Sequence, residues 1–96
     1  MQKLPCVYIL TNRRNGTLYT GVTSNLPHRI WQHKNSVIDG FSKRYATHQL
    51  VFYEIHESME SAILREKQIK SGSRKRKLEL IEAFNPRWED LYNSIL

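Results

Sequence analysis

Two polar side chains interrupt an apolar helical stripe early in the chain. At about 100° per residue, Leu26, Ile30 and Val37 fall in one narrow sector of a helix. His33 falls in the same sector, and Arg29 lies one turn before it on the adjoining row. Such a pair could bind a phosphate and move a proton. A histidine facing a core can equally be structural, and the spacing leaves both interpretations open.

A carboxylate interrupts a second apolar stripe further along the chain. Glu66 lies at the middle of this stripe and Lys70 lies beside it. Burying a carboxylate without a partner is costly, so Glu66 is either a metal ligand or a charged member of a site. The alternative is a helical ion pair between Glu66 and Lys70, worth a few tenths of a kcal/mol. The apolar residues of the stripe are Met59, Ala62, Ile63 and Ile69.

A pair of tyrosines flanks the first predicted turn. Asn15-Gly16 is a strong hairpin signal, and strands pairing around it could project Tyr8 and Tyr19 from one sheet face. Gly21 would allow a helix or ligand to approach closely. Ordinary aromatic packing explains the tyrosines as well.

Positive charge is concentrated in one stretch. Fifteen Lys and Arg oppose nine Asp and Glu, which gives a net charge of +6. This excess lies between Arg65 and Lys77, where Glu66 is the one acidic residue. Clustered positive charge is typical of proteins that bind a polyanion, most often nucleic acid. A basic face that only aids solubility is the alternative.

The elements that must position these residues follow the order β-β-α-β-α-α-α. Strands are predicted at 4–10, 17–23 and 49–56, with a polar loop at 36–48. Helices are predicted at 26–35, 58–70 and 74–84, and a last short helix starts at Asn85-Pro86. This order predicts an α+β fold, an α/β sandwich in which helices flank a small three-stranded sheet with an N-terminal β-hairpin.

Length and composition bound the class of protein. A chain of 96 residues is one domain; we expect its main body over residues 4–84, with residues 85–96 a C-terminal helical extension packed on the same domain. No apolar stretch approaches the ~20 residues of a membrane helix, so no membrane association is expected. The single cysteine, Cys6, cannot form an internal disulfide, and the expected location is the cytoplasm.

Short motifs in a fixed order along the chain resemble the GIY-YIG nuclease superfamily, and in particular its small stand-alone single-domain bacterial members. The first two motifs are Val7-Tyr8-Ile9 and Tyr19-Thr20-Gly21, and Asn25-Leu26 then leads to Arg29 and His33. Leu50-Val51-Phe52-Tyr53-Glu54, Ala62 through Lys70, and Asn85 through Leu91 continue the resemblance. The sequence departs from the family pattern at Cys6, Val7 and Thr20, which are backbone or packing positions.

The resemblance implies a divalent-metal-dependent endonuclease that hydrolyses DNA phosphodiester bonds, in DNA repair or recombination. It implies that Glu66 binds Mg²⁺ (or Mn²⁺), with Gly21 and Asn85 as structural support. Tyr8 would act as general base if its pKa of about 10 falls substantially. Arg29 would neutralise charge on the phosphate. The implied catalytic residues are Tyr8, Tyr19, Arg29, His33 and Glu66.

Basic side chains around these residues are expected to hold flanking phosphates without reading sequence. A protein partner that supplies specificity is possible in a chain this short, and the oligomeric state stays open. The rival interpretation is a nucleic-acid-binding module on the nuclease fold that does not cut efficiently. The expected DNA-binding residues are Lys34, Lys43, Arg44, Lys67, Lys70, Arg74, Lys75, Arg76 and Lys77.

Overall fold

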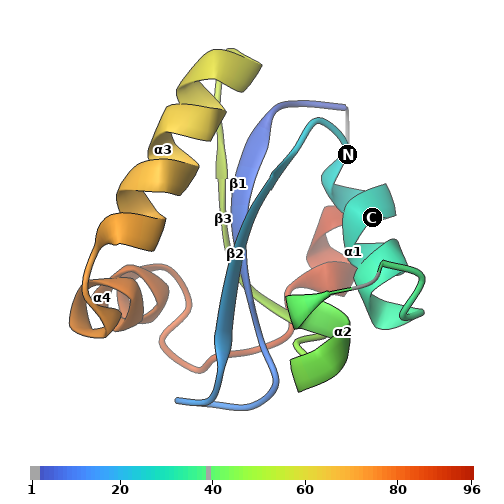
Figure 1. Ribbon diagram of the computed structural model, residues 1–96, viewed down its shortest axis with the longest axis vertical. Helices are drawn as coiled ribbons and strands as arrows, with labels where there is room; N and C mark the ends of the chain where they lie inside the picture. The colour runs from blue at the N-terminus through green and yellow to red at the C-terminus, as the bar shows by residue number, and fades with distance from the viewer. Residues whose placement is uncertain (1–2, 39) are drawn as a thin grey trace.

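The computed structural model describes residues 3–38 and 40–96. Its helices lie on both faces of one sheet (Figure 1). In chain order the elements are β1 (Cys6–Thr11), β2 (Leu18–Thr23), α1 (Leu26–Lys34), α2 (Phe41–Tyr45), β3 (Gln49–Ile55), α3 (Met59–Ser71), α4 (Arg74–Phe84) and the 3₁₀-helix η1 (Tyr92–Ile95).

The sheet has three antiparallel strands in the order β2-β1-β3. β1 and β2 form the predicted hairpin, whose turn is closed by the Gly16 N–H donating to the Arg13 carbonyl at 2.9 Å. β3 pairs with the other edge of β1, with an irregularity between Ile9 and Leu10. Because β1 has a strand on each side and helices on both faces, all six of its residues are buried.

Successive residues of β1 enter two different cores, since side chains alternate across a strand. One core lies between the sheet and α3 and α4; its members include Val7, Ile9, Ala62, Ile69 and Ile81. The other lies between the sheet, α1 and η1; its members include Cys6, Tyr8, Leu10, Leu26, Ile30 and Ile95. The predicted α+β sandwich, with an N-terminal hairpin and flanking helices, is therefore confirmed.

Local sequence explains where the helices begin. The Asn25 side chain accepts a hydrogen bond from a backbone N–H of the first turn of α1, and Pro27 lies inside that turn. Ser58 and Ser73 cap α3 and α4 in the same way, with N···O distances of 3.1 and 3.2 Å. These caps satisfy donors that a helix leaves without partners.

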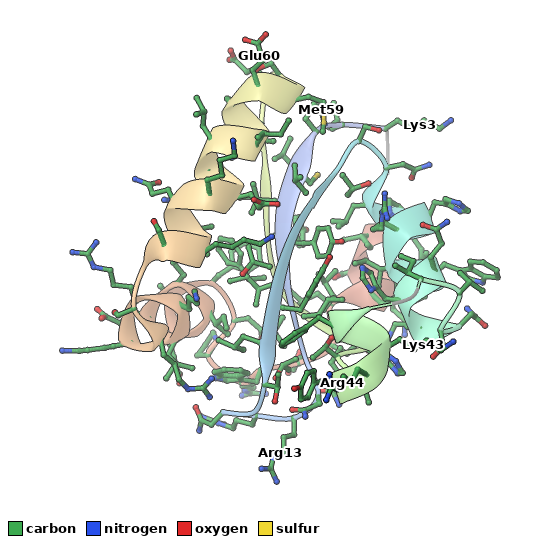
Figure 2. The ribbon with its side chains drawn as sticks, viewed as in Figure 1. Lys3, Arg13, Lys43, Arg44, Met59 and Glu60 are labelled. Carbon is green, nitrogen blue, oxygen red and sulfur yellow. The ribbon has the colours of Figure 1, made fainter. Side chains whose placement is uncertain are left out.

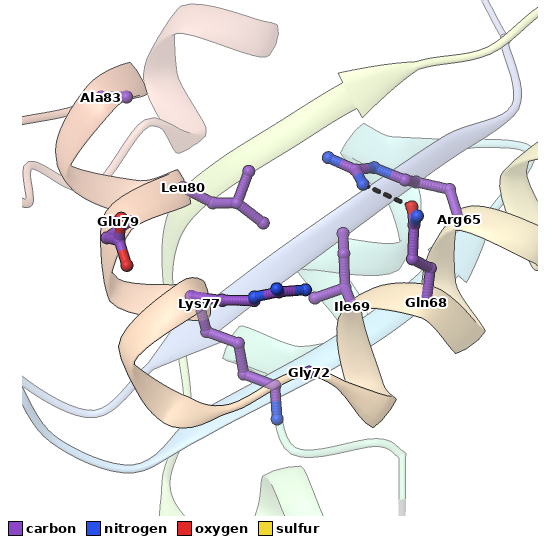
Figure 3. Close-up of a pocket in the computed structure, with 9 residues that line it drawn as sticks. Arg65, Gln68, Ile69, Gly72, Lys77, Glu79, Leu80 and Ala83 are labelled. Atoms are coloured by element: carbon purple, nitrogen blue, oxygen red, sulfur yellow. Dashed lines mark hydrogen bonds between the residues drawn. The ribbon is translucent and has the colours of Figure 1, made fainter.

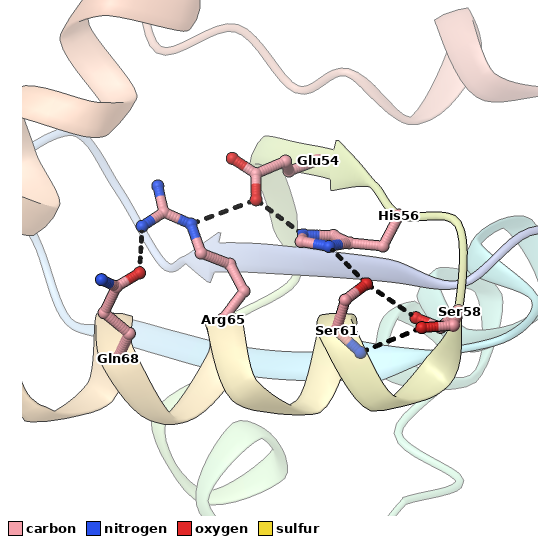
Figure 4. Close-up of polar contacts among 6 residues, drawn as sticks. All are labelled: Glu54, His56, Ser58, Ser61, Arg65 and Gln68. Carbon is pink, nitrogen blue, oxygen red and sulfur yellow. Dashed lines mark hydrogen bonds and ion pairs between the residues drawn. The ribbon is translucent and has the colours of Figure 1, made fainter.

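A polar network fastens the first turns of α3 to the end of β3 (Figure 4). Glu54 Oε1 lies 2.7 Å from His56 Nε2 and accepts a hydrogen bond from Arg65 Nε at 3.1 Å. His56 Nδ1 lies 3.0 Å from Ser61 Oγ. The network fixes the direction of the helix that carries Glu66.

The C-terminal segment closes over β3 and α1. The Leu91 N–H donates to the Leu50 carbonyl at 2.8 Å, and the Leu50 N–H donates to Asp90 Oδ1 at 3.2 Å. Asp90 also forms an ion pair with Lys34 of α1, and Ile95 is buried in the core that contains Tyr8. This segment is thus in direct contact with the helix that carries Arg29 and His33.

Two predicted elements differ from the structure. Residues 41–45 form α2 inside the segment expected to be a polar loop. The last helix is the four-residue η1, rather than a helix from Asn85, because Trp88 adopts a left-handed backbone with φ 56° and interrupts the segment. Across the described ranges, no helix combines the length and apolar character needed to cross a membrane.

The apolar stripes of α1 and α3 also contain fewer buried residues than the sequence predicts. α1 ends at Lys34, so Val37 lies beyond it and is 58% exposed. On α3, Ala62 and Ile69 are buried, whereas Met59 and Ile63 are more than one third exposed. His33 and Glu66 therefore lie at the inner edges of short stripes.

Candidate active site

Tyr8 and Tyr19 lie on the same face of the β1–β2 hairpin. The strand register pairs Tyr8 with Gly21 and Tyr19 with Leu10, which makes the two tyrosines diagonal neighbours. Their ring centroids are 6.2 Å apart. Tyr8 is 2% exposed, and Tyr19 is only partly buried. The hairpin thus presents one enclosed phenol and one accessible phenol.

Gly21 makes room for the hydroxyl end of the Tyr8 ring. A Cβ atom at Gly21 would lie 2.5 Å from both Cζ and Oη of Tyr8, a distance that side chains do not tolerate. The Tyr8 ring is fully packed, so it has little space into which to retreat. The absence of a side chain at Gly21 therefore permits the observed position of the Tyr8 hydroxyl.

The α1 helix brings His33 and Arg29 to these tyrosines. His33 is 2% exposed, and its Nε2 lies 2.9 Å from the Tyr8 hydroxyl. The His33 ring also contacts Tyr19, with centroids 5.3 Å apart. Arg29 is partly exposed and close enough to act electrostatically on Tyr8 and His33. His33, for which the sequence allowed a functional or a structural role, is thus buried and in contact with both tyrosines.

Burial moves two pKa values in opposite directions. Desolvation and the neighbouring Tyr19 raise the pKa of Tyr8 well above its usual range, against the opposing charge of Arg29. Burial, with added repulsion from Arg29 and His48, lowers the pKa of His33 to about 4. At neutral pH Tyr8 keeps its proton and His33 is uncharged. The low Tyr8 pKa that the sequence interpretation required is therefore absent from the protein alone.

Glu66 reaches the same region from α3, which packs on β1 and β2. Its side chain is 16% exposed, and its charge acts on Tyr8. Lys70, one turn later, places Nζ 3.4 Å from Glu66 Oε2. The helical ion pair foreseen as an alternative is therefore formed, while Glu66 stays within electrostatic reach of the tyrosine.

The donor set fits a cation that needs few protein ligands. Within residues 3–38 and 40–96, no three His, Cys, Asp or Glu side chains cluster as a metal site would require. Glu66 supplies one carboxylate that is mostly shielded from water. Mg²⁺ commonly binds through one or two carboxylates, substrate phosphates and several waters. Glu66 is thus compatible with Mg²⁺ or Mn²⁺ held jointly with a substrate.

Two of the expected DNA-binding lysines border a hollow beside Tyr19. The hollow has a volume of about 270 Å³, and Lys70 of α3 and Lys77 of α4 line it together with Tyr19 and Phe41. The Phe41 ring stacks on Tyr19 with centroids 6.0 Å apart. An anionic chain in this hollow would lie between two ammonium groups and a catalytic candidate.

The other expected basic residues fall into distinct groups. Lys34 is bound by Asp90 and the His48 carbonyl, and Arg74 donates to the carbonyls of Asn15 and Gly16. These two therefore fasten the fold. Lys43 and Arg44 lie on α2, at the same end of the molecule as the hairpin turn that carries Arg13 (Figure 2). The other expected DNA-binding residues on α3 and α4 are exposed, and they are Lys67, Lys75 and Arg76.

A second hollow lies between α3 and α4 (Figure 3). Its volume is about 330 Å³, and its lining includes Arg65, Ile69, Arg76 and Leu80. These helices cover the face of β1 that carries Val7 and Ile9, so this hollow is separate from the tyrosine cluster.

Asn85 joins three backbone segments. Its Nδ2 donates to the carbonyls of Val51 and Glu89 at 3.2 and 2.8 Å, and its Oδ1 accepts the Glu89 N–H at 3.1 Å. The side chain is buried, so these bonds hold the C-terminal segment against β3. Its contacts are those expected of a residue that supports the fold.

Sequence inspection missed two hydroxyl residues behind His33. Ser42 Oγ lies 2.8 Å from His33 Nδ1, and Thr47 donates to Ser42 Oγ at 2.9 Å. Both residues are buried in the segment interpreted as a polar loop. Short polar residues in a loop are too common to be noticed without the fold, and the sequence contains no other signal for them.

Known proteins resemble this chain over most of its length. A UPF0213 protein of Staphylococcus saprophyticus is 37% identical over 68 residues, covering 71% of this chain and 83% of the relative. One from Clostridium perfringens is 38% identical over 77 residues, covering 80% and 82%. The solution NMR structure of a UPF0213 protein from Bacillus halodurans has a TM-score of 0.56 at 28% identity and covers 90% of each chain.

The match to a family model is the most direct of these comparisons. The model of the GIY-YIG catalytic domain matches residues 4–79, a range that contains Tyr8, Tyr19, Arg29, His33 and Glu66. The chain therefore belongs to the GIY-YIG family.

Proposed function

We propose that this protein is a divalent-metal-dependent endonuclease that hydrolyses phosphodiester bonds in DNA. GIY-YIG domains form a nuclease superfamily, which makes a hydrolase the coarse conclusion. The observation that carries the finer proposal is the 2.9 Å contact between the buried Tyr8 hydroxyl and His33 Nε2. A neutral histidine beside a tyrosine can accept the proton of the tyrosine hydroxyl.

The chain's own side chains divide the reaction among them. Water attacks phosphorus in line while Tyr8 accepts a proton from that water and releases its own to His33. Arg29 binds the phosphate oxygens on which negative charge grows, where a fixed guanidinium is most effective. Tyr19, which is accessible beside the hollow, orients the phosphate or the nucleophile.

Glu66 would hold Mg²⁺ or Mn²⁺. The bound ion would supply positive charge to the scissile phosphate and to the departing oxygen. Lys70 pairs with Glu66 in the protein alone, so it would give up this pair and bind a flanking phosphate, together with Lys77. Breaking the Glu66–Lys70 pair costs little, because ion pairs of an exposed lysine contribute about 0–1 kcal/mol to stability.

A cleavage assay with and without metal tests the proposal. Purified protein is incubated with supercoiled, branched and single-stranded DNA, in the presence of Mg²⁺, Mn²⁺ or a chelator. We expect metal-dependent cleavage by the parent and almost none by Glu66→Gln, which keeps the shape of the side chain and removes a charged ligand. Lys70→Gln is the matched control: it breaks the same ion pair and should retain most of the cleavage rate at low salt.

Cleavage by Glu66→Gln at the parental rate would show that Glu66 is not the metal ligand. The Glu66–Lys70 pair, at 3.4 Å, also favours a second candidate: a non-catalytic module that binds nucleic acid. That module would bind every DNA in the assay and cut none under any metal condition.

The setting of the reaction is part of the same proposal. The reaction would serve DNA repair or recombination. It would take place in the cytoplasm, because Cys6 is a buried free thiol suited to a reducing compartment. A protein partner would supply any specificity that the short chain lacks. Copurification with such a partner, followed by cleavage assays of the complex, tests this part separately.

A further inference from the structure

Ser42 and Thr47 lie on the opposite side of the His33 ring from Tyr8. Ser42 belongs to α2 and is 3% exposed, and Thr47 follows α2 and is fully buried. His33 Nδ1 points at Ser42 Oγ, while its Nε2 points at Tyr8. Both ring nitrogens of a buried histidine are therefore engaged, each by a hydroxyl group.

The partners of Ser42 determine which nitrogen of His33 carries the proton. Ser42 has one hydroxyl proton, and we assign it to the bond with the Thr47 carbonyl at 3.1 Å, because that buried carbonyl can only accept and His33 Nδ1 can donate instead. The Thr47 hydroxyl donates to Ser42 Oγ at 2.9 Å. The Ser42 oxygen is then left as an acceptor toward His33, so Nδ1 carries the hydrogen and Nε2 carries the lone pair.

The backbone holds this arrangement in place. Ala46 has φ 54°, in the left-handed region, and the turn it makes brings the Thr47 N–H to the Ser42 carbonyl at 3.0 Å. Ser42 and Thr47 are thus joined by backbone and side-chain bonds. Rotating the Ser42 hydroxyl toward His33 would leave this buried carbonyl without that hydrogen bond, which is unfavourable.

We propose that Ser42 is a positioning residue for phosphodiester hydrolysis: it accepts the Nδ1 hydrogen of His33 and so keeps the Nε2 lone pair directed at the Tyr8 hydroxyl. The proposal rests on the function proposed above. With the opposite tautomer, Nε2 would donate to Tyr8, and the tyrosine would have no acceptor for its proton.

Every proton that moves during the proposed phosphodiester hydrolysis has a donor and an acceptor. The attacking water gives one proton to Tyr8 Oη as its oxygen bonds to phosphorus, and Tyr8 gives its own proton to His33 Nε2. The bond from phosphorus to the leaving oxygen breaks, and that oxygen takes a proton from solvent. His33, now with hydrogen on both nitrogens, keeps its Nδ1–H on Ser42 and returns the Nε2 proton to solvent through Tyr8.

The tautomer can be measured without any cleavage. Long-range ¹H–¹⁵N NMR spectra of protein labelled at histidine separate the two nitrogens of neutral His33. In the parent at pH 7 we expect hydrogen on Nδ1. In Ser42→Ala the population should move to Nε2–H, because Tyr8 is then the remaining acceptor. Ser42→Thr, which keeps the hydroxyl, should restore Nδ1–H, and Ser24→Ala, at an exposed serine, should leave the spectrum unchanged.

Single-turnover cleavage and DNA binding at fixed salt complete the test. Loss of a group that orients a metal-ligating histidine typically costs on the order of ten- to a hundredfold, and we take the same range for the histidine that Ser42 orients. We expect Ser42→Ala to lose this much in rate, with unchanged DNA affinity and an altered pH–rate profile. Ser42→Thr should recover the rate. The other groups that face His33 are the same in every variant: Tyr8, Tyr19, Arg29 and His48.

The outcomes separate this proposal from the function on which it rests. If the parent cleaves no DNA, the proposed function fails, and the NMR spectra still decide whether Ser42 sets the tautomer. If Ser42→Ala cleaves like the parent, or keeps hydrogen on Nδ1, the proposal for Ser42 is wrong. Should Ser42→Ala not fold, Ser42→Cys serves instead: it nearly keeps the shape of Ser42 and replaces the hydroxyl by a thiol, which is a weak acceptor. It should raise the Nε2–H population, and an unchanged spectrum would overturn the proposal.

Discussion

Tyr8 is held in place from several directions, and this explains why its chemistry depends on its neighbours. Gly21 leaves space for its hydroxyl, His33 Nε2 lies 2.9 Å from that hydroxyl, and Arg29 supplies the charge that opposes the rise in its pKa. Without these contacts a buried phenol would be inert. The tyrosine and its neighbours therefore act as a unit, whose members cannot be assigned additive contributions.

Removing the guanidinium or the phenol should affect rate far more than binding. Arg29→Ala removes a donor aimed at growing negative charge, and loss of one such donor typically costs on the order of a hundred- to a thousandfold in rate. Tyr8→Phe keeps the ring and deletes the ionisable oxygen, and a similar loss is expected. Single-turnover cleavage beside equilibrium DNA binding measures the two effects separately.

The control for these two variants is their thermal unfolding. Both should unfold near the parental temperature. Normal cleavage by Tyr8→Phe would exclude Tyr8 as the base and leave His33 as the candidate. A parallel loss of binding and stability would instead make both residues structural.

His33 should also make stability depend on pH. Its pKa is lowered to about 4 in the fold, against about 6.5 in an unfolded chain. The unfolded chain takes up a proton first as pH falls, so the contribution of neutral His33 is complete above pH 6.5 and declines toward pH 4. The full difference is about 3 kcal/mol.

Chemical denaturation of the parent and of His33→Gln at several pH values measures this effect. Between pH 7 and 4 the parent should lose more free energy of unfolding than the variant, because both share every other titrating group. Equal slopes in the two proteins would show that His33 titrates normally.

At the level of elements, the strands and long helices could be predicted from the sequence. Asn15-Gly16, the serine caps and the apolar periodicity each report on local structure. α2 could not be predicted, because five residues after Gly40 lack a side-chain cap and are too short to be stable alone. It forms because Phe41 stacks on Tyr19 and Ser42 bonds to His33, and those contacts exist only in the folded chain.

The same limit applies to the site. Tyr8, Tyr19, Arg29, His33 and Glu66 stood out because they interrupt apolar patterns or fit motifs. The direction of the Tyr8 pKa shift did not follow from the sequence, because burial depends on the whole sheet. Lys34 and Arg74 were indistinguishable from other basic residues until Asp90 and the hairpin carbonyls were seen to bind them.

The ends of α3 and α4 should carry the salt-dependent part of DNA binding. Lys70 and Lys77 border the hollow beside Tyr19, so Lys70→Gln with Lys77→Gln should weaken binding to all sequences alike. Each lost phosphate contact should reduce the slope of log affinity against log salt by roughly 0.7–0.9.

Lys3→Gln with Arg87→Gln provides a control of equal charge change, at exposed positions that are not among the expected DNA-binding residues. Binding titrations at several salt concentrations compare the two double variants. A parental slope in both double variants would place the phosphate track elsewhere, on α2 with Lys43 and Arg44.

Considered whole, the molecule keeps its site together through its C-terminal residues. Ile95 is buried in the core that contains Tyr8 and Ile30, and it is far from both in sequence. Ile95→Ala should lower the free energy of unfolding by about 2–5 kcal/mol through the lost burial and the cavity.

Thermal unfolding beside the neighbouring variant Leu96→Ala checks this expectation. Leu96 is 67% exposed, so its truncation should leave the unfolding temperature nearly unchanged. Similar temperatures for the two variants would show that the C-terminal segment does not contribute to the core.

The central place of β1 has a consequence for synthesis of the chain. β1 and β2 leave the ribosome well before β3, so the nascent hairpin carries an unpaired edge along an almost wholly apolar strand. Such an edge is a template for pairing with another copy, and hence for aggregation. Until β3 is translated and docks on that edge, the nascent hairpin depends on dilution or on chaperones to stay apart from its neighbours on the same messenger RNA.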